Sequence, residues 1–362
     1  MSFRTQATDP SLLAFYEKLR ANQLAPLWEI LREYVTPRPS PRGRSHLWRW
    51  REMRPIVEEA GERAPMGIGE RRVLNFVSPG LESKWAATET LWAAYQYILP
   101  GEHAPTHRHS ASAIRFIIEG AGAYTTVAGE KLRLHRNDFV VTPPWVWHAH
   151  GNDSDRPIVW MDGLDVPLVA ELDAMFFEPL GERPEPPGKP QGDSAARFAA
   201  GGLRPAWGRP AGPASPLLIY RWEETRAALR RLAGVEESPF DGAAMAYVNP
   251  ATGGPVLPTI GCWIQLLKPG ARARAHRHTT SAVYCVAEGR GSSVIEGTRF
   301  DWEPGDIFTL HPWAWHEHAA GEGSEAVLFS IHDTPVMEAL GLYREEALGT
   351  NGGHQEVVGV FG

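Results

Sequence analysis

Residues 144–150 read PWVWHAH, and residues 312–318 read PWAWHEH. A second pair of segments precedes these in the same order: residues 100–109 begin with Pro-Gly and end with His-Arg-His, and so do residues 269–278. The two offsets, 168 and 169 residues, are nearly equal. Duplication of a single domain explains this arrangement, so we predict that the chain contains two copies of one fold.

The sequence around both copies has the pattern of short β-strands. From Arg71 to about Asp165, and again from Pro258 to about Ile331, short alternating or apolar runs are separated by glycine-containing turns. The 36 glycines and 31 prolines of the chain agree with many strands and turns. Both copies are therefore predicted to be all-β.

Helices are expected outside the two β regions. Apolar residues recur every three to four positions from Ser11 to about Thr36, which predicts an amphipathic arm, and a second helix is expected through Glu59. The Pro/Gly/Ala-rich residues 178–215 are typical of a surface linker. Further helices are expected at about 223–232 and 335–348. The predicted parts are an N-terminal helical arm (1–70), a first β domain (71–177), a linker with a helix (178–250) and a second β domain (251–362).

The composition narrows the class of protein. The chain has 362 residues and a formal net charge of −7, so two domains can each bury a core. Without a stripe of Lys and Arg, nucleic acid is not the expected partner. No apolar run is long enough to span a membrane, and no secretory signal begins the sequence, so a cytoplasmic location is expected. The two cysteines form no motif.

The histidines predict a metal site. In an extended His-x-His segment both imidazoles lie on one face of the strand, because side chains alternate with period two. His107 and His109 can therefore reach one ion, and His148 is placed to join them if its strand returns across a small barrel. Three neutral imidazoles suit a divalent first-row metal and leave coordination positions open for substrate or oxygen.

Two segments resemble the cupin motifs: Gly101-x5-His107-x-His109, and Asn137-x5-Pro143-x4-His148-x3-Asn152. Asn137 and Trp145 stand where glycine is usual. With HRHSASAIRFIIEG at 107–120 and TPPWVWHAHGN at 142–152, the doubled arrangement resembles the bicupin gentisate 1,2-dioxygenases and their salicylate and 1-hydroxy-2-naphthoate relatives. The resemblance implies two double-stranded β-helix (jelly-roll) domains and a homotetramer.

The same resemblance implies an Fe(II) enzyme that inserts both atoms of O2 into an aromatic hydroxy acid, for gentisate giving maleylpyruvate. The implied iron ligands are His107, His109 and His148. Positions that match the family imply these catalytic and substrate-binding residues: Arg115, His150, Asp162, Gln96, Trp92 and one of the pair Arg71 and Arg72. Alternation along a strand allows only one of those two arginines to face the pocket.

The second copy keeps a full ligand set, His276, His278 and His316, so a second metal is expected to be able to bind there. Its surroundings differ: Tyr284 corresponds to Arg115 and the counterpart of Asp162 falls near Ser330, although His318 corresponds to His150. Without the arginine, an anionic substrate loses its best charge partner. We therefore expect the first domain to carry most of the turnover.

Three alternatives remain open from the sequence. The same chemistry could act on salicylate or 1-hydroxy-2-naphthoate instead of gentisate. A non-catalytic, metal-stabilised cupin could bind an aromatic acid, because this fold hosts many functions. An isomerase using Zn or Mn would be distinguished by the absence of oxygen consumption.

Overall fold

The computed structural model describes residues 9–64, 72–183, 185–208, 210 and 212–362. The described residues up to Ser40 form one compact unit and residues 41–362 form another. The first unit contains two helices, α1 (Pro10–Ala21) and α2 (Leu27–Tyr34), so the prediction of one helix from Ser11 to Thr36 is wrong. Pro26 precedes α2 and Gln23 adopts a left-handed conformation, which interrupts the helical hydrogen bonds between them.

One buried tyrosine holds the two helices of this first unit together. The Tyr16 hydroxyl donates to Glu29 Oε1 at 2.7 Å and accepts from Trp28 Nε1 at 2.8 Å. Tyr16 belongs to α1 and both of its partners belong to α2. The apolar residues Phe15, Leu24, Leu27 and Leu31 of the amphipathic pattern are exposed.

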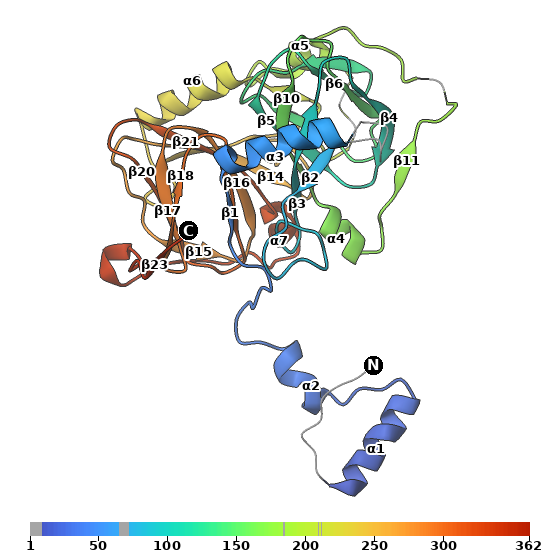
Figure 1. Ribbon diagram of the computed structural model, residues 1–362, viewed down its shortest axis with the longest axis vertical. Coiled ribbons are helices and arrows are strands. Elements are labelled where there is room, and N and C mark those ends of the chain that lie inside the picture. The colour runs from blue at the N-terminus through green and yellow to red at the C-terminus, as the bar shows by residue number, and fades with distance from the viewer. Residues whose placement is uncertain (1–8, 65–71, 184, 209, 211) are drawn as a thin grey trace. The chain divides into compact units, whose positions relative to one another are not determined.

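The first β domain consists of two antiparallel sheets (Figure 1). In spatial order, the six strands of one sheet are β12 (Ile219–Tyr220), β8 (Phe139–Thr142), β5 (Ala113–Glu119), β10 (Ile158–Leu164), β3 (Trp92–Ile98) and β2 (Val73–Asn75). The five strands of the other are β11 (Phe177–Pro179), β4 (His103–His109), β9 (His148–Gly151), β6 (Tyr124–Val127) and β7 (Glu130–Arg133).

The second β domain repeats this order and adds one edge strand, β23, to its second sheet. Its first sheet runs β1 (Leu47–Trp48), β19 (Ile307–Leu310), β16 (Ala282–Glu288), β21 (Ala326–His332), β14 (Gly261–Leu267) and β13 (Ala243–Ala246). Its other sheet runs β22 (Glu345–Ala347), β15 (His276–His278), β20 (His316–Ala320), β17 (Gly291–Ile295), β18 (Thr298–Trp302) and β23 (Gly359–Val360). The predicted duplication and the all-β, jelly-roll architecture are confirmed.

Two edge strands come from distant parts of the chain. Leu47–Trp48 precedes the first β domain in sequence but pairs with β19 of the second. Ile219–Tyr220, from the segment expected to be a linker, pairs with β8 of the first. Each strand covers an otherwise unpaired sheet edge, which removes a template for association with another chain.

The helices pack on the sheets or follow their last strands. Helix α3 (Trp50–Arg63) contacts β3, and α6 (Trp222–Ala233) contacts β13 and β14 (Figure 1). The remaining helical segments are α4 (Val166–Glu171), α5 (Asp193–Phe198), α7 (Thr334–Ala339) and the 3-10 turn Asn351–Gly353. The predicted closing helix at 335–348 is therefore too long. The chain leaves it at Leu340 and forms strand β22, which pairs with β15.

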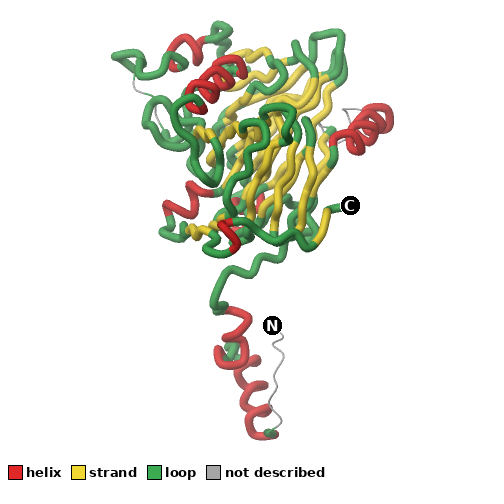
Figure 2. The backbone as a smooth tube through the Cα atoms, turned by 90° about the vertical axis from the view of Figure 1, so that its left-hand side faces the viewer, coloured by secondary structure: helices red, strands yellow, loops and turns green. Residues whose placement is uncertain are grey.

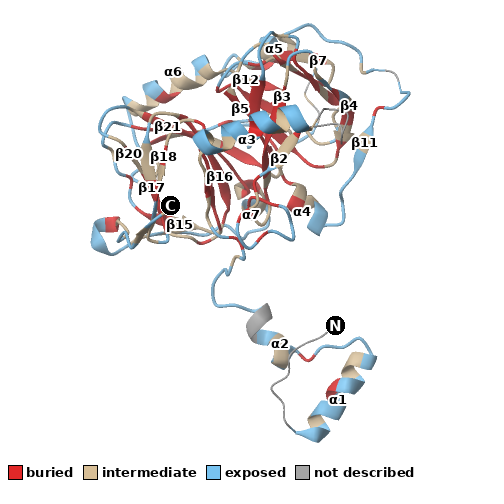
Figure 3. Ribbon diagram, in the orientation of Figure 1, coloured by how far each residue is buried: buried red, intermediate tan, exposed pale blue. Residues whose placement is uncertain are grey.

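A common hydrophobic core joins the two β domains. Phe116 of β5 and Phe329 of β21 stack with ring centroids 4.2 Å apart and an interplanar angle of 8°. Figure 2 shows the sheets as adjacent layers, and Figure 3 shows buried residues along their central strands. The domains are therefore parts of one packed body. In the described parts of the chain, no helix is long and apolar enough to cross a bilayer.

Candidate metal centre and its pocket

Three histidines meet inside the first β domain. His107 and His109 lie on β4, and His148 begins the adjacent strand β9, directly opposite His107. All three are buried, and one ring nitrogen of each lies within 4.8 Å of the others. The alternation of the strand places His107 and His109 on one face, and the antiparallel pairing supplies the third imidazole.

Backbone carbonyls orient the three imidazoles. Each Nδ1 lies 2.7–2.8 Å from a carbonyl oxygen two residues away in sequence, those of Pro105, Ala111 and Val146. A hydrogen bond from Nδ1–H fixes the tautomer in which Nε2 is the ligand atom. Among the described residues, the buried Nε2 of His148 has no hydrogen-bond partner.

Burial keeps the site neutral. It lowers the pKa of His148 well below its ordinary value, and His107 adds to that effect. A neutral imidazole is the form that binds metal. Three such nitrogens facing one point fit a divalent first-row ion and leave coordination positions for other ligands.

The two replaced motif glycines keep the glycine conformation. Asn137 has φ 64° and Trp145 has φ 65°, both in the left-handed region. The Trp145 N–H donates to the His109 carbonyl at 2.8 Å, so this turn ties the loop before His148 to the strand that carries His109.

A cavity of about 180 Å³ opens beside the histidines. The side chains of His109, Trp92, Gln96, Arg115 and Asp162 line it, together with Val73, Ala111, Leu164, Val166, Met175 and Phe177. The predicted residues Trp92, Gln96, Arg115 and Asp162 are therefore gathered at one cavity.

Arg115 is the centre of a buried polar network. It lies directly opposite Asp162 across β5 and β10, with Nε 3.3 Å from Oδ1. Its Nη2 lies 3.1 Å from His150 Nε2, and its Nη1 donates to the Thr142 hydroxyl. Burial lowers the pKa of Arg115, and the Asp162 carboxylate opposes that shift. The sequence-predicted trio of Arg115, His150 and Asp162 thus forms one contiguous unit.

Sequence reasoning did not identify three members of this site. Trp160 is fully buried and donates from Nε1 to Asp162 Oδ1 at 3.0 Å. Thr142 contacts Arg115, and the Phe177 ring stacks on His107 at 5.2 Å. The position of Trp160, two residues before Asp162 on the same face of a strand, was the available signal. No sequence signal marked Phe177, because its strand β11 pairs with β4 only in the folded chain.

Of the two adjacent arginines, Arg72 points away from the cavity. Its guanidinium forms a two-pronged ion pair with Glu102 at 2.9 and 2.7 Å and donates to the Tyr97 and Ala64 carbonyls. It is not among the residues that line the cavity. Arg71 lies outside the described residues, so its predicted contact with substrate stays a prediction.

The second β domain contains a matching cluster. His276 and His278 of β15 and His316 of β20 place their ligand atoms within 4.8 Å of one another. Two neutral residues take the places of Arg115 and Asp162: Tyr284 and Ser330 lie opposite each other across β16 and β21. The charges that act on this cluster are the carboxylates of Asp241 and Glu345. Burial lowers the pKa of His278 to about 4.

Two jelly-roll domains, each with a His-x-His strand and a third histidine from the neighbouring strand, define a bicupin with two candidate metal centres. A cupin domain model matches residues 94–166 and 263–332.

Three full-length comparisons place the chain within this class. It is 42% identical to 5-aminosalicylate 1,2-dioxygenase of Comamonas sp., and the match covers 96% of this chain and 93% of the relative. It is 43% identical to gentisate 1,2 dioxygenase 1 of Aquipseudomonas alcaligenes, and that match covers 91% of this chain and 95% of the relative. A crystal structure of salicylate 1,2-dioxygenase from Pseudoaminobacter salicylatoxidans with gentisate superposes with a TM-score of 0.88 at 35% identity. The superposition covers 97% of this chain and 98% of that chain. The chain belongs to the gentisate 1,2-dioxygenase family of ring-cleaving dioxygenases, which confirms the resemblance.

Proposed function

We propose that the protein is an Fe(II)-dependent dioxygenase that cleaves the ring of gentisate to give maleylpyruvate. The observation that carries the proposal is the juxtaposition of three buried histidines with a cavity that contains a buried arginine. When bound by His107, His109 and His148, iron would supply a redox-active centre with open positions for substrate oxygens and O2.

The chain's own residues would bind and orient the acid. Arg115 offers the planar, forked donor that suits a carboxylate, and Asp162 holds that fork in place from the opposite strand. Gln96 and Trp92 would form the wall against the ring. His150 lies within hydrogen-bond distance of Arg115 and carries the imidazole suited to accept the proton of a substrate hydroxyl.

The size of the cavity favours a single ring. At about 180 Å³ it is close to the roughly 150 Å³ cavity that holds one benzene molecule. Gentisate and salicylate have one ring, whereas 1-hydroxy-2-naphthoate has two fused rings. We therefore rank the naphthoate last. Gentisate stays ahead of salicylate because relatives named gentisate 1,2-dioxygenase match almost the whole chain.

For the second cluster we propose metal binding with little turnover. His276, His278 and His316 would be its ligands. Tyr284 and Ser330 provide no positive charge for a carboxylate. Family likeness also leads us to propose a cytoplasmic homotetramer. Light scattering would measure the mass of the assembly.

The function is tested by reconstituting the protein anaerobically with Fe(II) and recording oxygen uptake and ultraviolet spectra. Gentisate, salicylate and 1-hydroxy-2-naphthoate are assayed in parallel. Uptake with gentisate, accompanied by a new maleylpyruvate absorbance, is the expected result. If iron binds at the first cluster and none of the acids consumes oxygen, the dioxygenase proposal is wrong and a binding role takes its place. Conversion of an acid without oxygen uptake would indicate an isomerase.

Variants assign the two sites. Replacing both His276 and His278 with Ala should leave most of the gentisate turnover in folded protein. Near-complete loss, with iron still bound at the first cluster, would contradict the assignment of turnover to the first domain.

A further inference from the structure

A buried carboxylate at the end of β10 joins the first metal cluster to the other β domain. Asp165 accepts the Ser112 backbone N–H on Oδ1 at 2.8 Å and the Thr259 hydroxyl on Oδ2. The Ser112 and Thr259 hydroxyls lie 2.9 Å apart. Thr259 precedes β14, so it belongs to the second β domain. We call Asp165, Ser112 and Thr259 the first latch.

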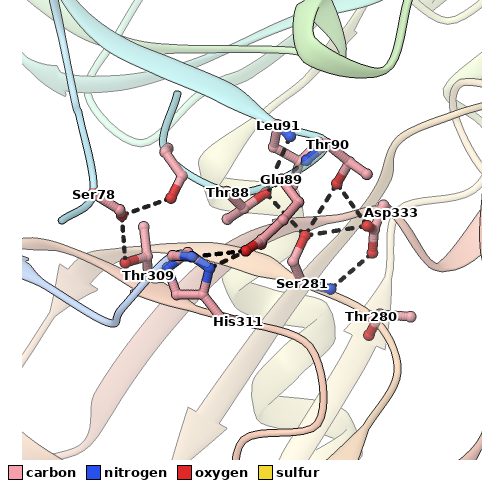
Figure 4. Close-up of polar contacts among 12 residues, drawn as sticks. Ser78, Thr88, Glu89, Thr90, Leu91, Thr280, Ser281, Thr309, His311 and Asp333 are labelled. Atoms are coloured by element: carbon pink, nitrogen blue, oxygen red, sulfur yellow. Dashed lines mark hydrogen bonds and ion pairs between the residues drawn. The ribbon is translucent and has the colours of Figure 1, made fainter. Parts of the chain in front are cut away.

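The pseudo-symmetric partner of this arrangement is present as well. Asp333 accepts the Ser281 N–H on Oδ1 at 2.8 Å and the Thr90 hydroxyl on Oδ2 at 2.6 Å. Thr90 and Ser281 hydroxyls lie 3.1 Å apart, and Figure 4 shows all three side chains converging. Asp333, Ser281 and Thr90 are the second latch. Each domain thus provides an aspartate and a serine and receives a threonine from the other.

The first latch reaches the metal cluster through a short loop. Ser112 follows Ala111, whose carbonyl orients His109 Nδ1 at 2.7 Å and whose side chain lines the cavity. Asp165 stands between Leu164 and Val166, which line the same cavity. The Thr259 hydroxyl therefore touches a carboxylate that anchors the loop of one ligand and part of the pocket wall.

The Thr259 hydroxyl supplies a hydrogen-bond donor to the buried carboxylate of Asp165. Asp165 is 1% exposed, and burial raises the pKa of its carboxyl. A buried carboxylate needs hydrogen-bond donors, and the loss of one leaves its oxygen less well satisfied at a cost in free energy. A methyl group in place of the hydroxyl would keep the volume of Thr259 but remove that donor.

We propose that Thr259, a residue of the second β domain, is a positioning residue for the first metal centre. It acts through Asp165 on the 109–112 loop, and Thr90 does the same for the second centre through Asp333. The inference rests on the proposed function, since it assumes that His107, His109 and His148 bind metal. Under this proposal each metal centre depends on a residue of the other domain, and the two histidine clusters need not touch each other.

The test compares Thr259→Val with the matched control Thr90→Val. Co(II) affinity is measured by chelator competition, the first centre in a His316→Ala background and the second in a His148→Ala background. Loss of a group that orients a metal ligand typically lowers affinity or activity by about 10- to 100-fold. Thr259→Val should weaken Co(II) binding at the first centre by at least tenfold, and Thr90→Val should weaken only the second. Thr259→Ser, which keeps the hydroxyl, should restore first-centre affinity.

Turnover and thermal denaturation complete the test. In otherwise unchanged protein, Thr259→Val should lower kcat for gentisate while Thr90→Val leaves it within twofold. If both variants lower the melting temperature equally and neither changes Co(II) affinity at its own centre, the latches only fasten the domains and the proposal is wrong. The proposed metal function is judged separately, because His148→Ala must abolish first-centre Co(II) binding whatever the latches do.

Discussion

The buried pair Arg115 and Asp162 gives a quantitative test of the pocket. Arg115→Met removes the cation but keeps a long side chain, and Asp162→Asn removes the anion but keeps an oxygen for the Trp160 Nε1–H. Both side chains are at most 6% exposed. Removal of one partner from such a pair costs about 3–5 kcal/mol, because the other charge stays buried without compensation.

The double variant should recover most of that loss. With both charges gone, no uncompensated ion remains, and replacing a buried pair by neutral groups is often close to neutral in stability. We expect each single variant to lose about 3 kcal/mol or more and the double variant to lose less than either. The coupling would then be about 3 kcal/mol or more, well above the roughly 0.5 kcal/mol within which independent sites add.

Urea unfolding of the metal-free proteins at pH 7, followed by circular dichroism, gives the four free energies of the cycle. Gentisate turnover should be lost in all three variants. Arg115→Met and the double variant lack the proposed carboxylate contact, and Asp162→Asn lacks the residue that positions Arg115. Additive single changes would refute the reasoning that the two charges compensate each other in a low-dielectric pocket. Full turnover in Arg115→Met would refute its proposed contact with substrate.

Three further predictions concern the ligands, the pocket wall and acid stability. His148→Ala should lose one equivalent of metal and all oxygen uptake, whereas His316→Ala should lose metal but keep oxygen uptake. Metal analysis and an oxygen electrode measure the two properties. Equal loss of uptake in both variants would contradict the assignment of turnover to the first domain. Phe177, stacked on His107 at the cavity, limits its size, so Phe177→Ala should raise kcat/KM for 1-hydroxy-2-naphthoate relative to gentisate by roughly tenfold; an unchanged ratio would show that the ring does not bound the site. Burial lowers the pKa of His332 to about 3, below its ordinary 6.5, so acidification below pH 6.5 protonates the unfolded chain first and the folded state loses stability. His332→Leu should reduce the stability lost by metal-free protein between pH 7 and 5 by about 2 kcal/mol in urea titrations, and an unaltered loss would be inconsistent with a neutral buried imidazole.

Much of the site could be predicted because its residues lie in short, repeated motifs. His107 and His109 are two positions apart, so a strand brings them together without help from the rest of the fold. Arg115 and Asp162 were found through family likeness, and the register of β5 and β10 places them directly opposite each other. Asn137 and Trp145 stand at motif positions for glycine and adopt the left-handed conformation expected there.

The errors arose where long-range pairing overrides local pattern. The 335–348 segment has helical character, yet its second half becomes a strand because the edge of β15 is available for hydrogen bonding. The arm divides into two helices at the left-handed Gln23 and at Pro26, and the Tyr16 contacts then join the two helices. A local propensity is worth less than about 1 kcal/mol per residue, so tertiary contacts can reverse it.

By itself the sequence determined the duplication, the all-β class and the two sets of candidate metal ligands, since each depends on spacing along the chain. Only the tertiary structure decided how the surrounding side chains come together and which further residues join them. Trp160, Thr142 and Phe177 join the site through sheet register and edge pairing. Thr259 reaches Asp165, 94 residues away in sequence, because the two domains share one core. Contacts of that range depend on the whole packed chain, and no local pattern of residues encodes them.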